Sequence, residues 1–292
     1  MLRSRVCLPR MSLRASSGRI ALALLAVYLI WGSTYLAIRF ALDTLPPFTM
    51  AGARFVLAGL CLLGFARGSG APPPDRAQWW SAALIGGLML VGGNGAVCWA
   101  EKTVPSGLAS LLIATVPLWA VVMGALLPGG QKPSPRVIAG ILFGLAGVGI
   151  LVQPQKSGSV DPAGAAALLF AAASWAAGSV LSKRVRLPSS PVLSTAMQML
   201  CGGSFLLLIG SIAGEWPGIH LQSVTTKSAL AVVYLMVFGS IIGFTAFVWL
   251  LRNTTAVIAT SYAYVNPLVE TIVGNQADLG GPGGRSTLSL GS

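Results

Sequence analysis

Blocks of about 20 mostly apolar residues follow one another along most of this chain, and each is long enough to cross a bilayer core of about 30 Å as a helix. Only 9% of the 292 residues are charged, and the mean hydropathy is +0.78, whereas soluble domains are about one quarter charged. The chain is therefore predicted to be an all-α integral membrane protein. Its nine expected spans are residues 20–38, 48–66, 79–100, 106–127, 136–153, 162–182, 191–213, 228–250 and 255–274.

Positive charge is concentrated in the N-terminal tail and in the short loops. The chain has 19 lysines and arginines against 7 acids, but no basic stripe marks a folded face, so nucleic acid is not an expected partner. If residues 1–19 form a basic cytoplasmic tail, thirteen basic residues fall inside and five outside. The positive-inside rule then predicts a cytoplasmic N-terminus. A signal peptide and a start at Met11 are alternative interpretations of the tail.

One stretch of the sequence occurs twice. Residues 99–124 align without a gap with residues 249–274, and the identical positions include Pro117 and Pro267. The segment WGSTYLAIR (31–39) aligns in the same way with WAAGSVLSK (175–183). Such recurrence indicates a chain built from two copies. Because proline removes a helical hydrogen bond, Pro117 and Pro267 are predicted helix breaks.

The two copies are predicted to be inverted. The first repeat, residues 20–153, holds five spans, and an odd number makes the second repeat, residues 162–274, enter the membrane in the opposite direction, as in secondary transporters. The second repeat has only four spans. Residues 275–292 are polar, rich in glycine and too short to cross. We expect this tail to be non-native, from a truncated or frame-shifted end, which leaves an inactive product as one interpretation.

Three segments resemble the EamA-type permeases of the drug/metabolite transporter superfamily. They are YLIWGSTYLAIRFALDTLPPFTMAGARF, GGNGAVCWAEKTVPSGLASLLIATVPLW and ATSYAYVNP, and the resemblance covers roughly residues 20–269. It implies two inverted EamA repeats of five helices, a multi-pass place in the bacterial cytoplasmic (inner) membrane, and export or exchange of small metabolites or drugs. A tenth helix, which the family has, is missing from this sequence.

Polar and aromatic side chains recur at helical spacing in several spans. Small and hydroxyl residues also pack membrane helices together, which is the alternative interpretation of these faces. With the repeats and the resemblance, they predict an uncharged, aromatic midplane pocket for neutral, zwitterionic or amphipathic molecules. Its expected wall residues are Trp31, Thr34, Tyr35, Asn94, Trp175, Ser179, Tyr262 and Asn266.

Two charged residues are further candidates. Arg54 lies within the second span, where an arginine costs on the order of 2.5–3.5 kcal/mol by insertion scales. Either it faces a cavity, where it would attract a carboxylate or phosphate, or its side chain reaches the outer interface. Glu101 lies at the end of the third span. It is either a proton or cation site near the outer mouth or an interfacial acid beside Lys102. Coupling through a deep mid-membrane carboxylate is not supported, because spans one, three, four and six carry none.

No cofactor, metal or catalytic residue is expected. With one histidine and four cysteines, the sequence indicates neither a zinc site nor a disulfide framework. A membrane-integral enzyme, the competing function, would need clustered His and Asp residues or a nucleophile with its base. The expected partners are membrane lipid, a small-molecule substrate and a second copy of the chain. That copy would pack through Gly140 and Gly144, whose spacing lets helices approach closely.

Overall fold

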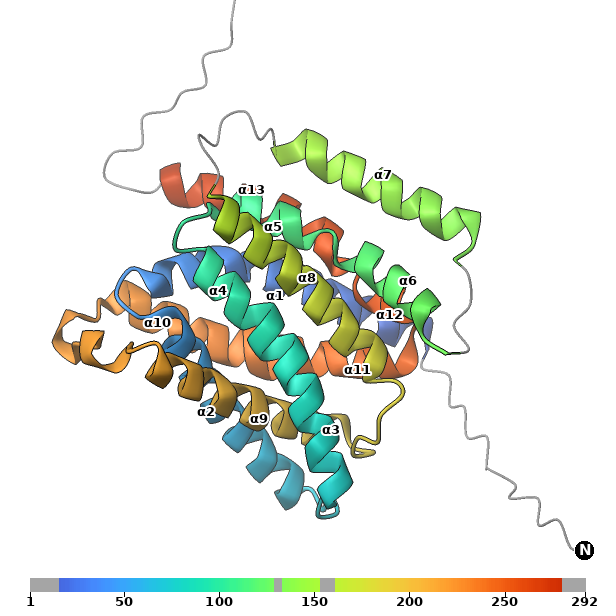
Figure 1. Cartoon of the computed structure of the whole chain (residues 1–292), viewed down its shortest axis with the longest axis horizontal. Helices are drawn as coiled ribbons and strands as arrows, with labels where there is room; N and C mark the ends of the chain where they lie inside the picture. Colours follow the sequence, from blue (N-terminus) through green and yellow to red (C-terminus); the bar gives the residue numbers. More distant parts are fainter. Residues whose placement is uncertain (1–15, 129–132, 153–160, 280–292) are drawn as a thin grey trace, which may run out of the picture.

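The computed structural model describes residues 16–128, 133–152 and 161–279, and every regular element in these ranges is helical (Figure 1). The elements of the first repeat are α1 (Ser17–Leu42), α2 (Pro47–Gly68), α3 (Arg76–Gly86), η1 (Gly87–Gly95), α4 (Ala96–Ala100), α5 (Ser106–Ile113), α6 (Val116–Leu126) and α7 (Pro135–Val152). Those of the second are α8 (Pro162–Leu181), α9 (Pro191–Ile212), η3 (Trp216–Gly218), η4 (Leu221–Ser223), α10 (Thr226–Tyr234), η5 (Leu235–Phe244), α11 (Thr245–Asn253), α12 (Ala256–Ala259) and α13 (Tyr262–Leu279).

These helices meet the length requirement for crossing a bilayer. Among the described residues, eight helical segments are long and apolar enough to do so, and α7 supplies an apolar helix at the remaining expected position. The predicted all-α membrane fold is confirmed, with eight of the nine expected spans long and apolar enough to cross among the described residues.

Several helices begin where the sequence provides a proline or a capping side chain. Pro47 and Pro191 open α2 and α9, where a missing N–H is tolerated because first-turn N–H groups have no partner inside the helix. These two prolines are equivalent positions of the two repeats, related in the same way as Trp31 and Trp175. At the start of α3, the Asp75 carboxylate accepts from the Gln78 backbone N–H, and the Gln78 side chain accepts from the Asp75 N–H. This reciprocal pair is a capping box.

Equivalent helix ends make the same contact in both repeats. Arg39 Nη1, at the end of α1, donates to the backbone oxygen of Glu101 after α4, over 2.8 Å. Lys183 Nζ, after α8, donates to the backbone oxygen of Leu251 near the end of α11. Arg39 aligns with Lys183 in the sequence, and Glu101 aligns with Leu251, so the structure repeats the pairing found in the sequence.

We call the end of the bundle with the Arg39 contact the Glu101 end, and the end with the Lys183 contact the Lys183 end. The Glu101 end also holds the ion pair between Lys227 and Asp43, and the Lys183 end holds the pair between Arg186 and Asp75. Each repeat contributes one of the two end contacts, and the five spans expected in the first repeat predict that these contacts lie on opposite sides of the membrane.

The second helices of the two repeats, α2 and α9, form an extensive helix pair in the bundle. A methyl group on Gly52 would lie 2.8 Å from the backbone nitrogen of Leu207, and one on Gly203 would lie 2.9 Å from the nitrogen of Val56. Only a glycine fits at such a close approach of two backbones, and small residues at helix crossings are typical of membrane proteins.

Helix α7 lies at one edge of the bundle, beyond α5, α6 and α13 (Figure 1), and it contacts α5 and α13. A methyl group on Gly144 would lie 2.9 Å from the ring of Tyr264, whereas one on Gly140 would have no neighbour within 4 Å among the described atoms. Gly144 therefore packs within the chain. Self-association through Gly140 and Gly144 stays a prediction.

The helix breaks differ from the prediction at one of the two prolines. The fourth span is interrupted at Ala114 and Thr115, and Pro117 follows in the first turn of α6. The last span is interrupted at Thr260 and Ser261, and Pro267 lies inside α13. The predicted break at Pro267 is therefore wrong, because a packed membrane helix tolerates the loss of one hydrogen bond.

The chain ends fall mostly outside the described residues. Of the predicted basic tail, residues 17–19 already belong to α1. At the other end, α13 continues to Leu279, so the helix extends beyond the expected end at Gly274. The remainder of the predicted tail 275–292 lies outside the described ranges.

Candidate functional site

A cavity lies between the two repeats. About 660 Å³ of space that is not filled by atoms lies within its outline, open solvent at the mouth included. Its wall includes all the predicted pocket residues except Ser179, whose hydroxyl donates to the backbone oxygen of Trp175. The predicted residues that line it are Trp31, Thr34, Tyr35, Asn94, Trp175, Tyr262, Asn266 and the charged candidate Arg54.

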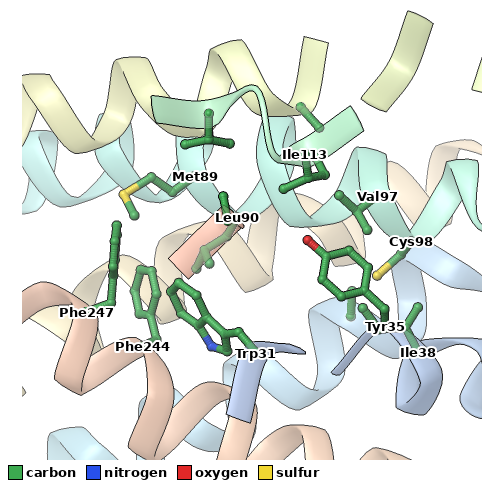
Figure 2. Packing of buried hydrophobic residues seen from close by; sticks show 14 of the residues in the cluster. Trp31, Tyr35, Ile38, Met89, Leu90, Val97, Cys98, Ile113, Phe244 and Phe247 are labelled. Atoms are coloured by element: carbon green, nitrogen blue, oxygen red, sulfur yellow. The ribbon is translucent and has the colours of Figure 1, made fainter. Parts of the chain in front are cut away.

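Aromatic rings from both repeats surround one side of the cavity. The Trp31 ring lies 5.3 Å from that of Trp175 and 4.7 Å from that of Tyr262, both edge to face. Figure 2 shows Phe244 and Phe247 beside Trp31, and the Phe247 ring centre is 5.0 Å from that of Trp31. Edge-to-face pairs of this kind add about 0.5–1.5 kcal/mol each beyond area burial. The aromatic group is therefore a preorganised apolar surface.

Two π-helical segments position the tryptophans. η1 and η5 lie in the third and eighth spans, and such bulges are frequent at functional sites. Trp31 Nε1 donates to the backbone oxygen of Gly239 in η5 over 3.0 Å. In the other repeat, Ser174, the neighbour of Trp175, donates to the backbone oxygen of Leu88 in η1 over 2.7 Å. Each π-helical segment thus binds the α1 or α8 helix across from it.

Arg54 carries the charge of the cavity wall. Its side chain is 3% exposed, and Nη2 donates to Asn94 Oδ1 over 2.5 Å. The guanidinium carbon also lies 4.5 Å from the ring centre of Phe55. Within the described ranges, neither ion pair involves Arg54. A buried cation without a carboxylate partner is costly in a membrane, so this position favours an anionic ligand.

Other polar groups in the wall have unused hydrogen-bonding capacity. Among the described residues, no partner is found for the buried Arg54 Nε, Trp175 Nε1, Ser240 Oγ or either amide atom of Asn266. Buried polar groups nearly always have a partner in proteins, from the protein itself, water or a ligand. Most of these groups are donors. The cavity is therefore suited to a molecule rich in acceptor oxygens.

Glu101 lies outside the cavity wall. Its side chain is fully buried, and neither carboxylate oxygen has a hydrogen-bond partner in the part of the chain that the structure describes. Arg39 contacts its backbone oxygen rather than its carboxylate. Its neighbour Lys102 is exposed, and the choice between a proton or cation site and an interfacial acid stays a prediction.

Sequence reasoning missed several wall residues. Ser240, Phe244 and Gly239 line the cavity, but nothing in their local sequence pattern distinguishes them from packing residues. The repeat contained a usable signal. Phe244 is the counterpart of Asn94 when the alignment that begins at Trp99 and Trp249 is extended upstream, so that extension would have paired it with a predicted wall residue.

A second cavity lies at the Lys183 end. Lys183, Arg252 and Gln198 are among its lining residues, and burial lowers the pKa of the Lys183 ammonium. Both cations already contact backbone oxygens, Lys183 that of Thr254 over 2.6 Å and Arg252 that of Pro188 over 2.7 Å. They therefore cap helix and loop ends here, and no ligand is needed to explain them.

At the Glu101 end, Asp161 caps α8. Its pKa is lowered by the hydrogen bond from the Thr103 hydroxyl and by the backbone N–H of Ala163. The contact joins the loop after α4 to the start of the second repeat.

Comparison with known proteins places the cavity in context. The EamA-like transporter family matches residues 18–153 and 162–275, which are the two halves that face each other across it. The chain belongs to the EamA-like transporter family. It is thus a membrane transporter of small molecules, and the resemblance seen in the sequence is confirmed.

Relatives of this EamA-like transporter extend over most of its length. It is 43% identical over 254 residues to the uncharacterized inner membrane transporter YedA of Escherichia coli strain K12, covering 86% of this chain and 80% of that one. It is 27% identical over 232 residues to a probable amino-acid metabolite efflux pump of Salmonella typhimurium, covering 76% and 74%. A crystal structure of 24% identity has a TM-score of 0.70 over 92% of this chain and 91% of the other, which shows a shared fold.

Proposed function

We propose that this EamA-like transporter moves small amphipathic molecules bearing a carboxylate or similar acceptor group across the bacterial cytoplasmic membrane. Transport proceeds outward or by exchange, through alternating access between the two repeats. The observation that carries the proposal is the wall of the central cavity. One buried cation and several unpartnered donors among the described residues belong to side chains that line this cavity, and aromatic rings line its other side.

Arg54 and the aromatic rings bind different parts of the substrate. A guanidinium binds a carboxylate through charge-assisted hydrogen bonds, and Arg54 has Nε unused among the described residues. The rings of Trp31, Trp175 and Phe244 offer a complementary surface for an apolar group. A molecule that fills both halves is amphipathic and small enough for the cavity.

The relatives support direction and location. A relative described as a probable amino-acid metabolite efflux pump supports export of small metabolites, and one described as an inner membrane transporter supports the cytoplasmic membrane. The position of the cavity between two inverted repeats supports alternating access, because rocking of one repeat against the other exposes such a site to either side.

The test is counterflow in proteoliposomes that contain the purified full chain. The probes are labelled amino acids and the corresponding 2-oxo acids and amines, so that the carboxylate and the amino group are varied separately. We expect exchange of carboxylates with an apolar side chain and no exchange of the amines. A panel in which amines exchange as well as carboxylates contradicts the proposed substrate class.

A pair of tryptophan variants assigns transport to the cavity. Trp31→Ala removes a wall ring, whereas Trp80→Ala removes a side chain that is 68% exposed and lies outside the wall. We expect exchange to fall about tenfold, equivalent to about 1.4 kcal/mol, for Trp31→Ala alone, at equal amounts of protein in the membrane. Equal exchange by both variants would place the substrate elsewhere.

A further inference from the structure

The two repeats differ along one line of residues that leads from the cavity to the Glu101 end. In the third span, Asn94, Cys98 and Glu101 follow at spacings of four and three residues, which places them on one face of the helix. The aligned residues of the second repeat, in the eighth span, are Phe244, Val248 and Leu251. The first repeat is polar where the second is apolar, so helix packing alone does not require these polar groups.

The polar line is connected at its cavity end. Asn94 Oδ1 accepts from Arg54 Nη2, and the Cys98 thiol lies 3.5 Å from the same oxygen in donor geometry. Asn94 and Arg54 line the cavity, and Cys98 is fully buried behind them. Figure 2 shows Cys98 beside Tyr35 and Ile38 of α1. Glu101 occupies the far end of this line, one turn beyond Cys98.

Glu101 is held in a state that does not suit a charge. It is 0% exposed, and both oxygens lack partners within the described ranges. Its counterpart Leu251 makes the same backbone contact with a basic side chain, so the position is built to pack an apolar residue. Removing an unpaired carboxylate from water is unfavourable, and taking up a proton avoids that cost.

The charged and titratable groups around Glu101 come from four elements. They are Arg39 and Tyr35 on α1, Arg54 on α2, Cys98 on α4 and Glu270 on α13. Glu270 accepts from the Ser106 hydroxyl at the start of α5 over 2.5 Å, where a helix N-terminus favours negative charge. Two neighbouring carboxyls resist ionising together. Neither oxygen of Glu101 has such a partner within the described residues, so Glu101 is the carboxyl that takes the proton.

We propose that Glu101 is a proton-binding site and that its proton keeps the Glu101 end of the transporter closed. When this end opens, water reaches the carboxyl, the proton passes to water on that side, and the carboxylate remains solvated. Closing requires a proton from the same side. The proposal rests on the proposed function in that the closed end is one state of its transport cycle.

The sign of the pH dependence follows from this linkage. The closed form binds the proton more tightly than the open form, so acid favours the closed form and its advantage is lost as pH rises. The effect acts between about pH 4.3, where a solvated glutamate ionises, and the higher pH at which the buried carboxyl does. Opening at the Glu101 end therefore increases with pH.

The native Cys98 reports opening of this end. The full chain carrying Cys7→Ser, Cys61→Ser and Cys201→Ser is purified in detergent, and the rate of Cys98 modification by N-ethylmaleimide is measured from about pH 5 to about pH 8. Ionisation of the thiol raises the rate with pH in every variant, so each rate is divided by that of Glu101→Gln. We expect the ratio to rise about tenfold, the effect of a one-unit difference in proton affinity between the two forms.

Glu215→Gln is the matched control. Glu215 lies at the same end, but its carboxylate already accepts from the backbone N–H and hydroxyl of Thr49, each over 2.7 Å. This variant should keep the full pH response. If Glu101→Gln does not accumulate, Glu101→Leu, which introduces the residue of the other repeat, takes its place with the same expectation.

Infrared difference spectra over the same pH range measure the proton directly. The intact chain should show the C=O band of a protonated carboxylic acid that disappears as pH rises, and Glu101→Gln should lack it. A constant labelling ratio, or a band unchanged by Glu101→Gln, overturns the proposal. Neither measurement uses a substrate, so failure here leaves the proposed function standing, and failure of the counterflow panel leaves the proton site standing.

Discussion

Arg54 is the charged side chain of the cavity wall, and its environment accounts for its place in the second span. Within the described residues its hydrogen-bond partner is Asn94, not a carboxylate. This contact also gives the Asn94 amide oxygen a strong donor in the middle of a membrane helix, beside the weaker Cys98 thiol. The pair keeps a cation available at the cavity without neutralising it, which is what an anion-binding site requires.

Arg54→Gln tests this role at the residue scale. The aligned residue of the second repeat is Gln198, so the substitution gives the first repeat the side chain of the second. Hydrogen bonds to charged groups contribute about 1.5–3 kcal/mol, so we expect the KM for a carboxylate probe to rise roughly 10- to 100-fold. The measurement is counterflow at several probe concentrations.

Arg67→Gln is the control for the loss of one positive charge. Arg67 is exposed at the end of α2, where it donates to the backbone oxygen of Ala71, and its removal should leave KM unchanged. A KM equally unaffected by Arg54→Gln would show that the guanidinium balances the local field rather than binding the probe.

Residue-level prediction from the sequence was effective where side chains share one helix. Trp31, Thr34 and Tyr35 follow helical periodicity within one span, and all three line the cavity. The surroundings of Glu101 depend instead on α1, α2 and α13, whose residues are far apart in the sequence. No local pattern contains that information, so the sequence left Glu101 open between a functional and an interfacial acid.

At the scale of the elements, the two π-helical segments let a tryptophan pack directly on backbone. A methyl group on Gly93 in η1 would lie 2.7 Å from the Trp175 ring, and one on Gly243 in η5 would lie 2.6 Å from Trp31 Nε1. These glycines are equivalent positions of the two repeats, so each repeat uses the same device. Periodicity predicts a helix in both spans but cannot show a π-helical segment, which arises from contacts with the neighbouring helix.

Gly93→Ala should therefore disturb the cavity. The added methyl group forces the Trp175 ring to move, and overpacking of this kind costs about 1–3 kcal/mol. We expect a lower thermal unfolding midpoint in detergent and a shifted tryptophan emission maximum.

Gly87→Ala in the same π-helical segment is the matched control. Its added methyl group would meet only the Phe205 ring at 3.9 Å, an ordinary contact, so this variant should unfold at the original midpoint or higher. Equal midpoints for the two variants would mean that η1 shifts to make room, and that Gly93 does not fix the tryptophan.

At the scale of the whole molecule, the repeats share a backbone design but differ in chemistry. The Arg39 and Lys183 contacts and the paired π-helical segments are common to both repeats. The Arg54–Asn94 pair and the carboxyl of Glu101 have apolar or uncharged counterparts in the second repeat, namely Gln198, Phe244 and Leu251. A symmetric frame permits two alternately open states of similar energy. The polar line of the first repeat allows the Glu101 end to respond to a proton, and the Lys183 end has no equivalent line among the described residues.

The sequence could predict this frame because the recurrence of the two aligned segments is carried by local identities such as Pro117 with Pro267. It could not predict how far α13 continues beyond Gly274 or where its last break falls. Those boundaries depend on packing between α12, α13 and their neighbours. Thr260, for instance, donates back to Ala256 at the observed break.

The orientation of the molecule is the remaining whole-molecule prediction. The ion pair of Arg186 with Asp75 and the basic side chains Arg184 and Arg252 gather at the Lys183 end, and basic loops stay in the cytoplasm. We predict that the Lys183 end is cytoplasmic and that the Glu101 end faces outward. The test uses a chain in which serine replaces Cys7, Cys61, Cys98 and Cys201. Single cysteines are then placed at Pro73 or Ser189 at the Lys183 end, and at Gly218 at the Glu101 end.

An impermeant maleimide added to intact cells should label the cysteine at Gly218, and it should label those at Pro73 and Ser189 only after the cells are opened. All three positions are exposed in the structure, so failure to react reports the side of the membrane rather than burial. The reverse labelling would place Glu101 on the cytoplasmic side. Its proton would then be exchanged with the cytoplasm, and acid outside the cell would no longer close the transporter.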